Sequence, residues 1–85
     1  MYTIIFEIDL KKTLKKIPKQ DAKKIIDTID TLANNPRPRW VEQLKGHIET
    51  LYRIRVGSYR VIYTINDNTL VVCVVDVDHR KDVYR

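Results

Sequence analysis

The sequence predicts a small α+β domain in which a mostly antiparallel sheet is covered on one face by a two-helix hairpin. The period of hydrophobicity changes from strand to helix near residue 9 and back to strand in the second half. Short turn signals then divide the last third into three apolar strands. With 85 residues, 44% of them hydrophobic, we expect residues 1–85 to form one domain of order β-α-α-β-β-β.

The first half of the chain predicts one strand followed by two helices. Residues 2–8 are rich in β-branched and aromatic side chains and predict the strand. Asp9 is a suitable N-cap for a first helix over residues 10–17, in which apolar side chains recur at helical spacing. A longer helix follows over residues 22–33, and Pro36 lies just beyond its end. The two helices should pack together on one face of the sheet.

Three strands are expected in the second half, at Glu49–Val56, Tyr59–Asn66 and Thr69–Val77. The dipeptides Gly57-Ser58 and Asp67-Asn68 supply the turns between them. The third of these strands is apolar on both faces, so we expect it to lie inside the sheet rather than at an edge.

The remaining features set the broad class of protein. Residues 36–46 are predicted to form a loop from which Trp40 and Leu44 reach back into the core. The lone Cys73 lies in an apolar run and is interpreted as a core residue. No stretch approaches the ~18 apolar residues of a membrane span, and the N-terminus does not read as a signal peptide. We therefore expect a cytoplasmic protein that does not bind membranes.

The hairpin centred on Gly57-Ser58 predicts a cluster of arginines. In its register Arg55 pairs with Arg60, and because side chains alternate between faces, Arg53 shares their face. Three guanidinium groups on one exposed face would form an anion site. Alternatively, Arg53 and Arg55 pair with carboxylates of neighbouring elements. The opposite face is apolar enough to pack on the helices and receives Tyr52, Ile54, Val56, Tyr59, Val61 and Tyr63.

The charge balance favours a polyanionic partner. The chain has 16 Lys and Arg against 11 Asp and Glu, a formal net charge of +5, which favours nucleic acid first and an acidic protein second. Many of the cations are lysines of the predicted helices, which either form a solvated face or contact RNA phosphates. No group of His, Cys, Asp and Glu has ligand spacing, so neither a metal nor another cofactor is expected. The lysines concerned, with one from the following loop, are Lys11, Lys12, Lys15, Lys16, Lys19, Lys23, Lys24 and Lys45.

Four segments together resemble the RelE/ParE superfamily of toxins from toxin-antitoxin systems. They are Leu44-Lys-Gly46, Tyr52-Arg-Ile-Arg55, Gly57-Ser-Tyr-Arg-Val-Ile-Tyr63 and His79-Arg-Lys-Asp-Val-Tyr84, which follow a lysine-rich helical hairpin. The resemblance implies a microbial-ribonuclease-like fold and, for the RelE branch, cleavage of messenger RNA in the ribosomal A site. It also implies a RelB-like antitoxin that wraps around the toxin, and a complex that binds operator DNA through the antitoxin.

The same resemblance implies a set of site residues. In metal-free RNA cleavage the 2′-hydroxyl attacks the adjacent phosphate, so the site needs a proton acceptor, a proton donor and cations. The positions of Arg53, Arg55 and Arg60 are basic in RelE toxins and lie beside the scissile phosphate. Arg80 and Tyr84 match the arginine and tyrosine that complete the site. Arg60 would hold the phosphate, and Arg80 is the family's candidate general acid.

Arg53 departs from the family pattern and leaves the general base open. Well-studied RelE toxins have a lysine there, whereas arginine stays protonated at physiological pH. Three alternatives remain: Tyr84 with a lowered pKa, His79, or substrate positioning by the ribosome. We favour Tyr84. Two other functions also remain open: a ParE-like toxin that binds DNA gyrase without being an enzyme, and a catalytically degenerate relative.

Overall fold

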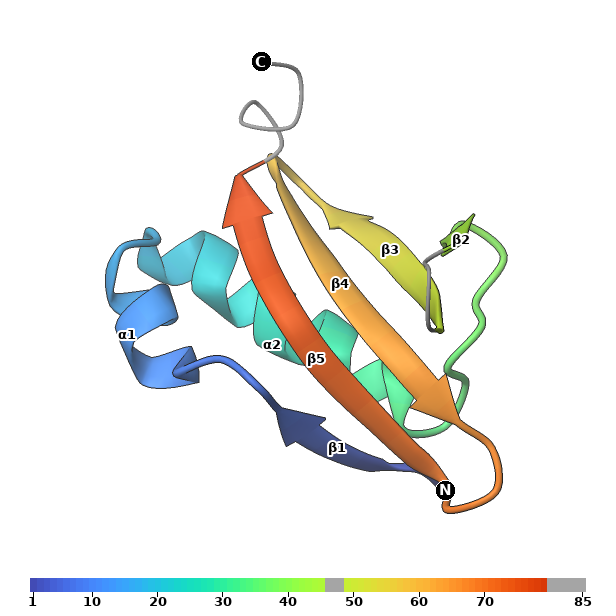
Figure 1. Cartoon of the computed structure of the whole chain (residues 1–85). Helices are drawn as coiled ribbons and strands as arrows, with labels where there is room; N and C mark the ends of the chain where they lie inside the picture. The colour runs from blue at the N-terminus through green and yellow to red at the C-terminus, as the bar shows by residue number, and fades with distance from the viewer. Residues whose placement is uncertain (46–48, 80–85) are drawn as a thin grey trace.

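The computed structural model describes residues 1–45 and 49–79 and has the predicted α+β architecture (Figure 1). The sheet is five-stranded, in the order β1-β5-β4-β3-β2. The β1–β5 pair is parallel and the other three pairs are antiparallel. The elements are β1 (Thr3–Phe6), α1 (Leu10–Lys15), α2 (Lys19–Leu32), β2 (Glu42–Lys45), β3 (Thr50–Val56), β4 (Tyr59–Asn66) and β5 (Val71–His79).

The two helices lie on the same side of the sheet. Asp9 caps α1 as predicted, because its Oδ1 accepts a hydrogen bond of 3.2 Å from the backbone N–H of Lys12. In Figure 1, α2 runs behind the strands and α1 lies beside the end of β5. The helical spacing of Ile25, Ile29 and Leu32 buries one face of α2. Neither helix is long and apolar enough to cross a membrane, a finding that concerns the described residues only.

The core lies between α2 and the helix-facing side of the sheet. Tyr63 is its largest fully buried side chain, and its hydroxyl donates a hydrogen bond of 2.7 Å to the backbone oxygen of Pro36. This bond ties the segment after α2 to β4. Burial also raises the pKa of the Tyr63 phenol above its ordinary value. The buried apolar residues are Ile25, Ile29, Leu32, Tyr52, Ile54, Val56, Val61, Tyr63, Val72, Val74 and Val77.

A second connection joins three distant segments at the end of the sheet that contains the β4–β5 turn. Arg37 donates to both carboxylate oxygens of Asp67, at 3.1 and 2.8 Å, and its guanidinium lies 5.4 Å from the centre of the Tyr52 ring. The Tyr2 hydroxyl donates to the same carboxylate at 2.6 Å. The hydrogen bonds from Arg37 and then Tyr2 lower the pKa of Asp67 to about 2. The N-terminus, the segment after α2 and the β4–β5 turn are therefore held together.

The prediction of a loop over residues 36–46 is wrong for Glu42–Lys45, which form β2 and pair with β3. Trp40 does not enter the core. This residue is 67% exposed. Leu44 is also not a core residue. It pairs with Leu51, and because side chains alternate along β3, both leucines lie on the face away from the helices. Val41 packs against the core instead. The polar pattern of β2 hid the strand, since an edge strand has little apolar surface to bury.

Strand β5 is interior, as predicted, but begins and ends two residues later than expected. The turn before it spans residues 67–70 rather than a dipeptide, and Leu70 there has a φ of 55°. Cys73 pairs with Thr64 on the face away from the helices and is half-buried, so its assignment to the core is wrong. Burial nonetheless raises the pKa of its thiol.

A bulge in β5 decides which side chains face the helices. Tyr63 pairs with Val74, but the preceding Ile62 pairs with Asp76, so Val75 is an extra residue. Beyond the bulge the alternation is shifted by one position. Val77 therefore enters the core, whereas Asp76 faces away from the helices.

Candidate functional site

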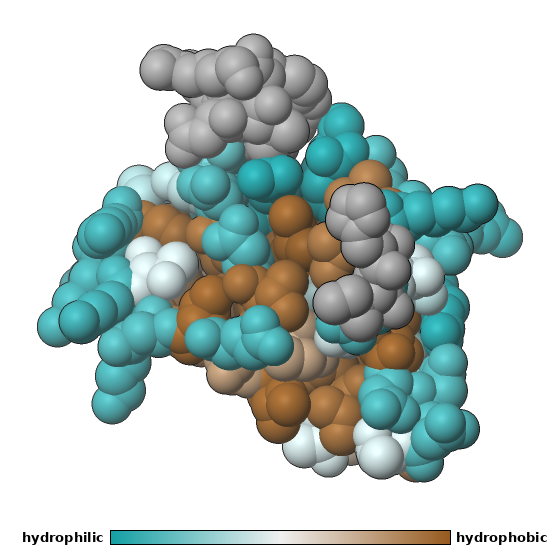
Figure 2. Space-filling model, viewed as in Figure 1, coloured by the Kyte–Doolittle hydropathy of each residue, from teal (hydrophilic) through white to brown (hydrophobic). Residues whose placement is uncertain are grey.

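The predicted arginine cluster lies on the sheet face away from the helices, hereafter the outer face. Arg55 pairs with Arg60 and Arg53 with Ile62, which confirms the expected register. The three guanidinium side chains come from β3 and β4, and side-chain alternation places them on the same face. Figure 2 views this face and shows hydrophilic side chains bordering an apolar centre.

Glu42 belongs to this cluster and was not identified from the sequence. Strand β2 places it opposite Arg53. Its Oε2 lies 2.6 Å from Nη2 of Arg53, and its Oε1 lies 3.4 Å from Nη2 of Arg55. For Arg53 and Arg55 the alternative of pairing with a carboxylate is therefore the observed arrangement. Only a prediction of β2 and its register could have identified Glu42, because the two segments are eleven residues apart.

Two further carboxylates make the cluster a mixed acid–base site. Asp78 pairs with Arg60 across the β4–β5 ladder, and Asp76 pairs with Ile62. Directly opposed residues have Cβ atoms about 5 Å apart. We call this set of residues the arginine–carboxylate strip. It contains Glu42, Arg53, Arg55, Arg60, Asp76 and Asp78.

The strip contains hydrogen-bond donors without an acceptor in the described structure. The Nε atoms of Arg53 and Arg60 are buried and have no hydrogen-bond partner among the residues described. A buried N–H of a charged group is costly to leave unpaired, and an anionic ligand would satisfy it. The strip therefore retains the capacity to bind an anion, although three carboxylates now accompany the three guanidinium groups.

The other predicted site residues are not all brought together. Arg80 and Tyr84 lie outside the described residues, so their roles stay predictions. His79 lies beyond the bulge, on the same side of the sheet as the helices and not on the outer face. Its ring contacts Tyr59 edge to face, with ring centres 5.0 Å apart. Tyr59 in turn packs against the core, as predicted.

The predicted lysines are exposed, and none of them is a member of the strip. Those on and around the two helices form a solvated surface, in which Lys23 contacts Asp27 at 3.4 Å. Lys45 is exposed at the end of β2. Within residues 1–45 and 49–79, no group of three or more His, Cys, Asp and Glu side chains could hold a metal ion. The exposed lysines are Lys11, Lys12, Lys15, Lys16, Lys19, Lys23, Lys24 and Lys45.

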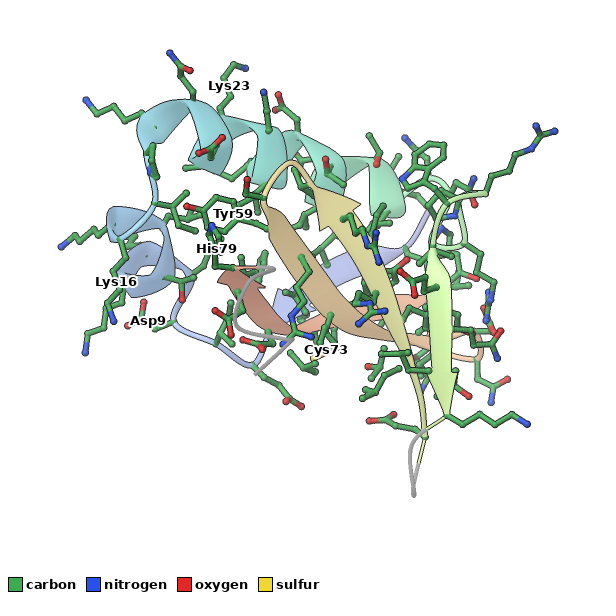
Figure 3. The ribbon with its side chains drawn as sticks, turned by 90° about the horizontal axis from the view of Figure 1, so that it is seen from above. Asp9, Lys16, Lys23, Tyr59, Cys73 and His79 are labelled. Atoms are coloured by element: carbon green, nitrogen blue, oxygen red, sulfur yellow. The ribbon has the colours of Figure 1, made fainter. Side chains whose placement is uncertain are left out.

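A pocket of about 510 Å³ lies between α1 and the adjoining ends of β4 and β5. Figure 3 shows Tyr59 and His79 on the strand side of this region, with Lys16 on the facing side at the end of α1. Asp76 and Asp78 also line the pocket. The pocket and the arginine–carboxylate strip therefore share two acidic residues at the end of β5.

A small five-stranded sheet with its helices on one face is also the fold of solved RelE toxins, which belong to toxin-antitoxin systems. The family described as the ParE toxin of the type II toxin-antitoxin system parDE matches residues 2–84. The chain therefore belongs to the RelE/ParE superfamily of these toxins.

Individual relatives agree with this membership. Toxin RelE3 of Methanocaldococcus jannaschii is 32% identical over 85 residues, covering 95% of this chain and 93% of the relative. Toxin RelG of Mycobacterium tuberculosis is 29% identical over 85 residues, covering 99% and 97%. The structure is similar to the archaeal RelE–RelB complex of Pyrococcus horikoshii, with a TM-score of 0.81, 31% identity and coverage of 93% and 94%.

Proposed function

We propose that this toxin is a metal-independent endoribonuclease that cleaves messenger RNA in the ribosomal A site, in the cytoplasm. The observation that carries the proposal is the arginine–carboxylate strip. It combines a carboxylate fixed by two arginines with a third arginine whose buried Nε has no partner in the described structure. Such a site can bind a phosphate and accept a proton on the same face.

Arg55 and Arg60 would hold the scissile phosphate. They are cross-strand neighbours, so a phosphate above them could contact both guanidinium groups. During attack by the 2′-hydroxyl, negative charge develops on the non-bridging oxygens of the phosphate. Cations already in place stabilise that charge without reorganising. These two residues therefore serve binding and charge stabilisation rather than proton transfer.

Glu42 would be the general base. Arg53 stays protonated, but it holds the Glu42 carboxylate at 2.6 Å and thereby orients it. The carboxylate would take the 2′-hydroxyl proton as the oxygen forms its bond to phosphorus. The bond from phosphorus to the 5′-oxygen then breaks, leaving a 2′,3′-cyclic phosphate. Arg80, which lies outside the described residues, is the predicted donor of the proton to the 5′-oxygen, and Tyr84, also outside them, is the alternative base predicted from the sequence.

Primer extension on a translated messenger RNA tests the nuclease directly. The wild-type toxin should cut at A-site codons in a reconstituted translation system, and Arg60→Ala should reduce the cleavage rate by about 10²-fold or more. Arg39→Ala is the matched control, since it removes an exposed arginine that lies outside the strip and outside the lysine surface. Intact message with folded wild-type protein would contradict the proposal, as would equal cleavage without ribosomes.

A RelB-like antitoxin is the proposed protein partner. The related toxins from Pyrococcus horikoshii and Methanococcus jannaschii were crystallised as RelE–RelB complexes. We infer that this chain likewise has a cognate antitoxin, through which the complex would bind operator DNA. The exposed helix lysines would contact ribosomal RNA phosphates, so ribosome binding should weaken as salt rises.

A ParE-like activity is the second candidate, because the matching family is described as the ParE toxin. In that case the chain would bind DNA gyrase without cutting RNA. A gyrase supercoiling assay with purified toxin distinguishes the two functions. Inhibition of supercoiling by both the wild-type protein and Arg60→Ala would favour gyrase binding. A folded toxin that is inactive in both assays would be a degenerate relative.

A further inference from the structure

The pocket beside α1 is separate from the arginines and large enough for a ligand. Its volume of about 510 Å³ lies in the range of small-molecule sites. One wall is formed by α1 with its C-cap, which contribute Lys12 and Lys16, and the other by the ends of β4 and β5. Strand β1 pairs only with the first half of β5, so it does not fill this space.

Charges of both signs line the pocket without neutralising one another. Lys12 and Lys16 face a lining that includes Asp76 and Asp78. None of these four takes part in an ion pair within 4.0 Å in the described part of the chain. A simple anion would be repelled by the carboxylates, and a simple cation by the lysines. The lining fits a ligand that has hydrogen-bond donors at one end and negative charge at the other.

Two aromatic side chains in the pocket lining further restrict the class of ligand that fits. The rings of Tyr59 and His79 contact each other edge to face and both line the pocket. Figure 3 shows both side chains on the strand side, opposite Lys16 at the end of α1. Unpaired bases of RNA are recognised by stacking on such rings and by hydrogen bonds to their edges. A nucleotide has all three required features: a flat ring, N–H donors and a phosphate.

The pocket is also next to the strip that would hold the scissile phosphate. Asp78 lines the pocket and is the cross-strand neighbour of Arg60. A strand of RNA whose phosphate lies on Arg60 would therefore need to extend only a short way around the end of β5. The inference rests on the proposed nuclease function for the identity of the RNA, but not for the existence of the site.

We propose that this pocket binds one nucleotide of the RNA, next to the phosphate held by the arginines. Asp76 or Asp78 accepts hydrogen bonds from the donor groups of the base, Tyr59 and His79 contact its ring, and Lys16 neutralises its phosphate. Guanine offers a carboxylate both an N–H and an amino group, whereas uracil offers one N–H. The site should therefore prefer guanine to uracil.

Titration of the ¹⁵N-labelled full-length toxin with 5′-GMP, followed by NMR, tests the site. GMP should shift amide signals of α1 and of the end of β5, with saturation in the millimolar range typical of a single weak contact. UMP should bind about tenfold more weakly, because one charge-assisted hydrogen bond is lost. Asp76→Asn should remove most of this preference, and Lys16→Ala should weaken both nucleotides. Lys23→Ala, on α2, should change neither.

Several outcomes would overturn the inference. One is the absence of saturable shifts at about 10 mM GMP. Another is inorganic phosphate causing the same shifts as GMP, which would show a simple anion site. A third is binding of a short strand-forming peptide of alternating valine and lysine at these amides without binding of GMP, which would assign the pocket to a protein strand.

The titration contains no ribosome and no phosphodiester that could be cleaved. Loss of RNA cleavage in the primer-extension assay would therefore refute the nuclease and leave a measured nucleotide site standing. Conversely, intact cleavage with no nucleotide binding would refute the pocket alone. In the cleavage assay itself, Asp76→Asn should alter which codons are cut.

Discussion

Replacing Glu42 with glutamine removes one negative charge from the arginine–carboxylate strip and keeps the shape of the side chain. The wild-type carboxylate contacts Arg53 at 2.6 Å and Arg55 at 3.4 Å. An amide oxygen can still accept from Arg53, so the strand and its register should persist. What the variant loses is the ability to accept a proton, together with the attraction between the carboxylate and the two guanidinium groups.

Two opposing effects on cleavage can be estimated. Loss of a general base typically lowers the rate by 10²- to 10⁴-fold, which is about 3 to 5 kcal/mol in activation free energy. Release of the arginines acts the other way, because an RNA phosphate no longer competes with the carboxylate. With the Glu42 side chain 42% exposed, two such pairs contribute at most about 2 kcal/mol, or roughly 30-fold in affinity. The net result expected for Glu42→Gln is slower chemistry with tighter substrate binding.

Single-turnover cleavage on programmed ribosomes separates these effects. The rate at saturating toxin reports the chemical step, and the toxin concentration at half-maximal rate reports binding. Asp27→Asn is the matched control, because it also converts the carboxylate of an ion pair to an amide but lies on the exposed surface of α2. Circular dichroism of each variant shows whether the fold is kept.

An unchanged or increased rate at saturation would refute the assignment of Glu42 as the base. In that case the carboxylate would only occupy the phosphate site in the absence of RNA, and the base would have to be sought at Tyr84, at His79 or in positioning by the ribosome. A rate loss without any change in binding would keep the base and refute the competition with phosphate.

Three further predictions concern stability and are read by thermal unfolding. Tyr63→Phe should cost about 1 kcal/mol, or about 4–8 °C, because the Pro36 carbonyl loses its buried donor; an unchanged Tm would exclude this bond as a stabiliser. Gly57→Ala should also cost about 1 kcal/mol, since the φ of +59° is strained for alanine, although a Cβ added at this position would have no atom within 4 Å; a gain in Tm would contradict this prediction. Hydrogen bonding by Arg37 lowers the pKa of Asp67 to about 2. The ionised Asp67 carboxylate therefore stabilises the fold at neutral pH, and this stabilisation is lost as the pH falls from about 4 to 2. Asp67→Asn should therefore flatten the acid side of the stability curve, and an identical curve would refute this.

The sequence was most informative where local chemistry decides the structure. The turn at Gly57-Ser58 needs a positive φ at glycine, so the β3–β4 register and the shared face of the arginines followed directly from it. The N-cap at Asp9 is equally local. In both cases a few neighbouring residues are enough to predict the conformation.

The features that were missed depend on long-range pairing. β2 is four residues long and mostly polar, so only its pairing with β3 makes it a strand, and that pairing brings Glu42 to Arg53. Trp40 is exposed although its size predicts burial, because the chain turns toward β2 at this point. The bulge could not be predicted from the sequence either, because the valines around it are compatible with both faces of the sheet.

The bulge at Val75 has a consequence for how this toxin is compared with other sequences. One extra residue reverses the facing of everything that follows it in β5, so Val77 is a core residue and Asp76 and Asp78 belong to the outer face. A homologue that lacks the extra residue would carry its acidic side chains at positions that an ungapped alignment equates with Val75 and Val77. Conservation counted column by column would then mix two faces of the sheet. Evolutionary comparisons of the site should first ask whether each homologue has the insertion.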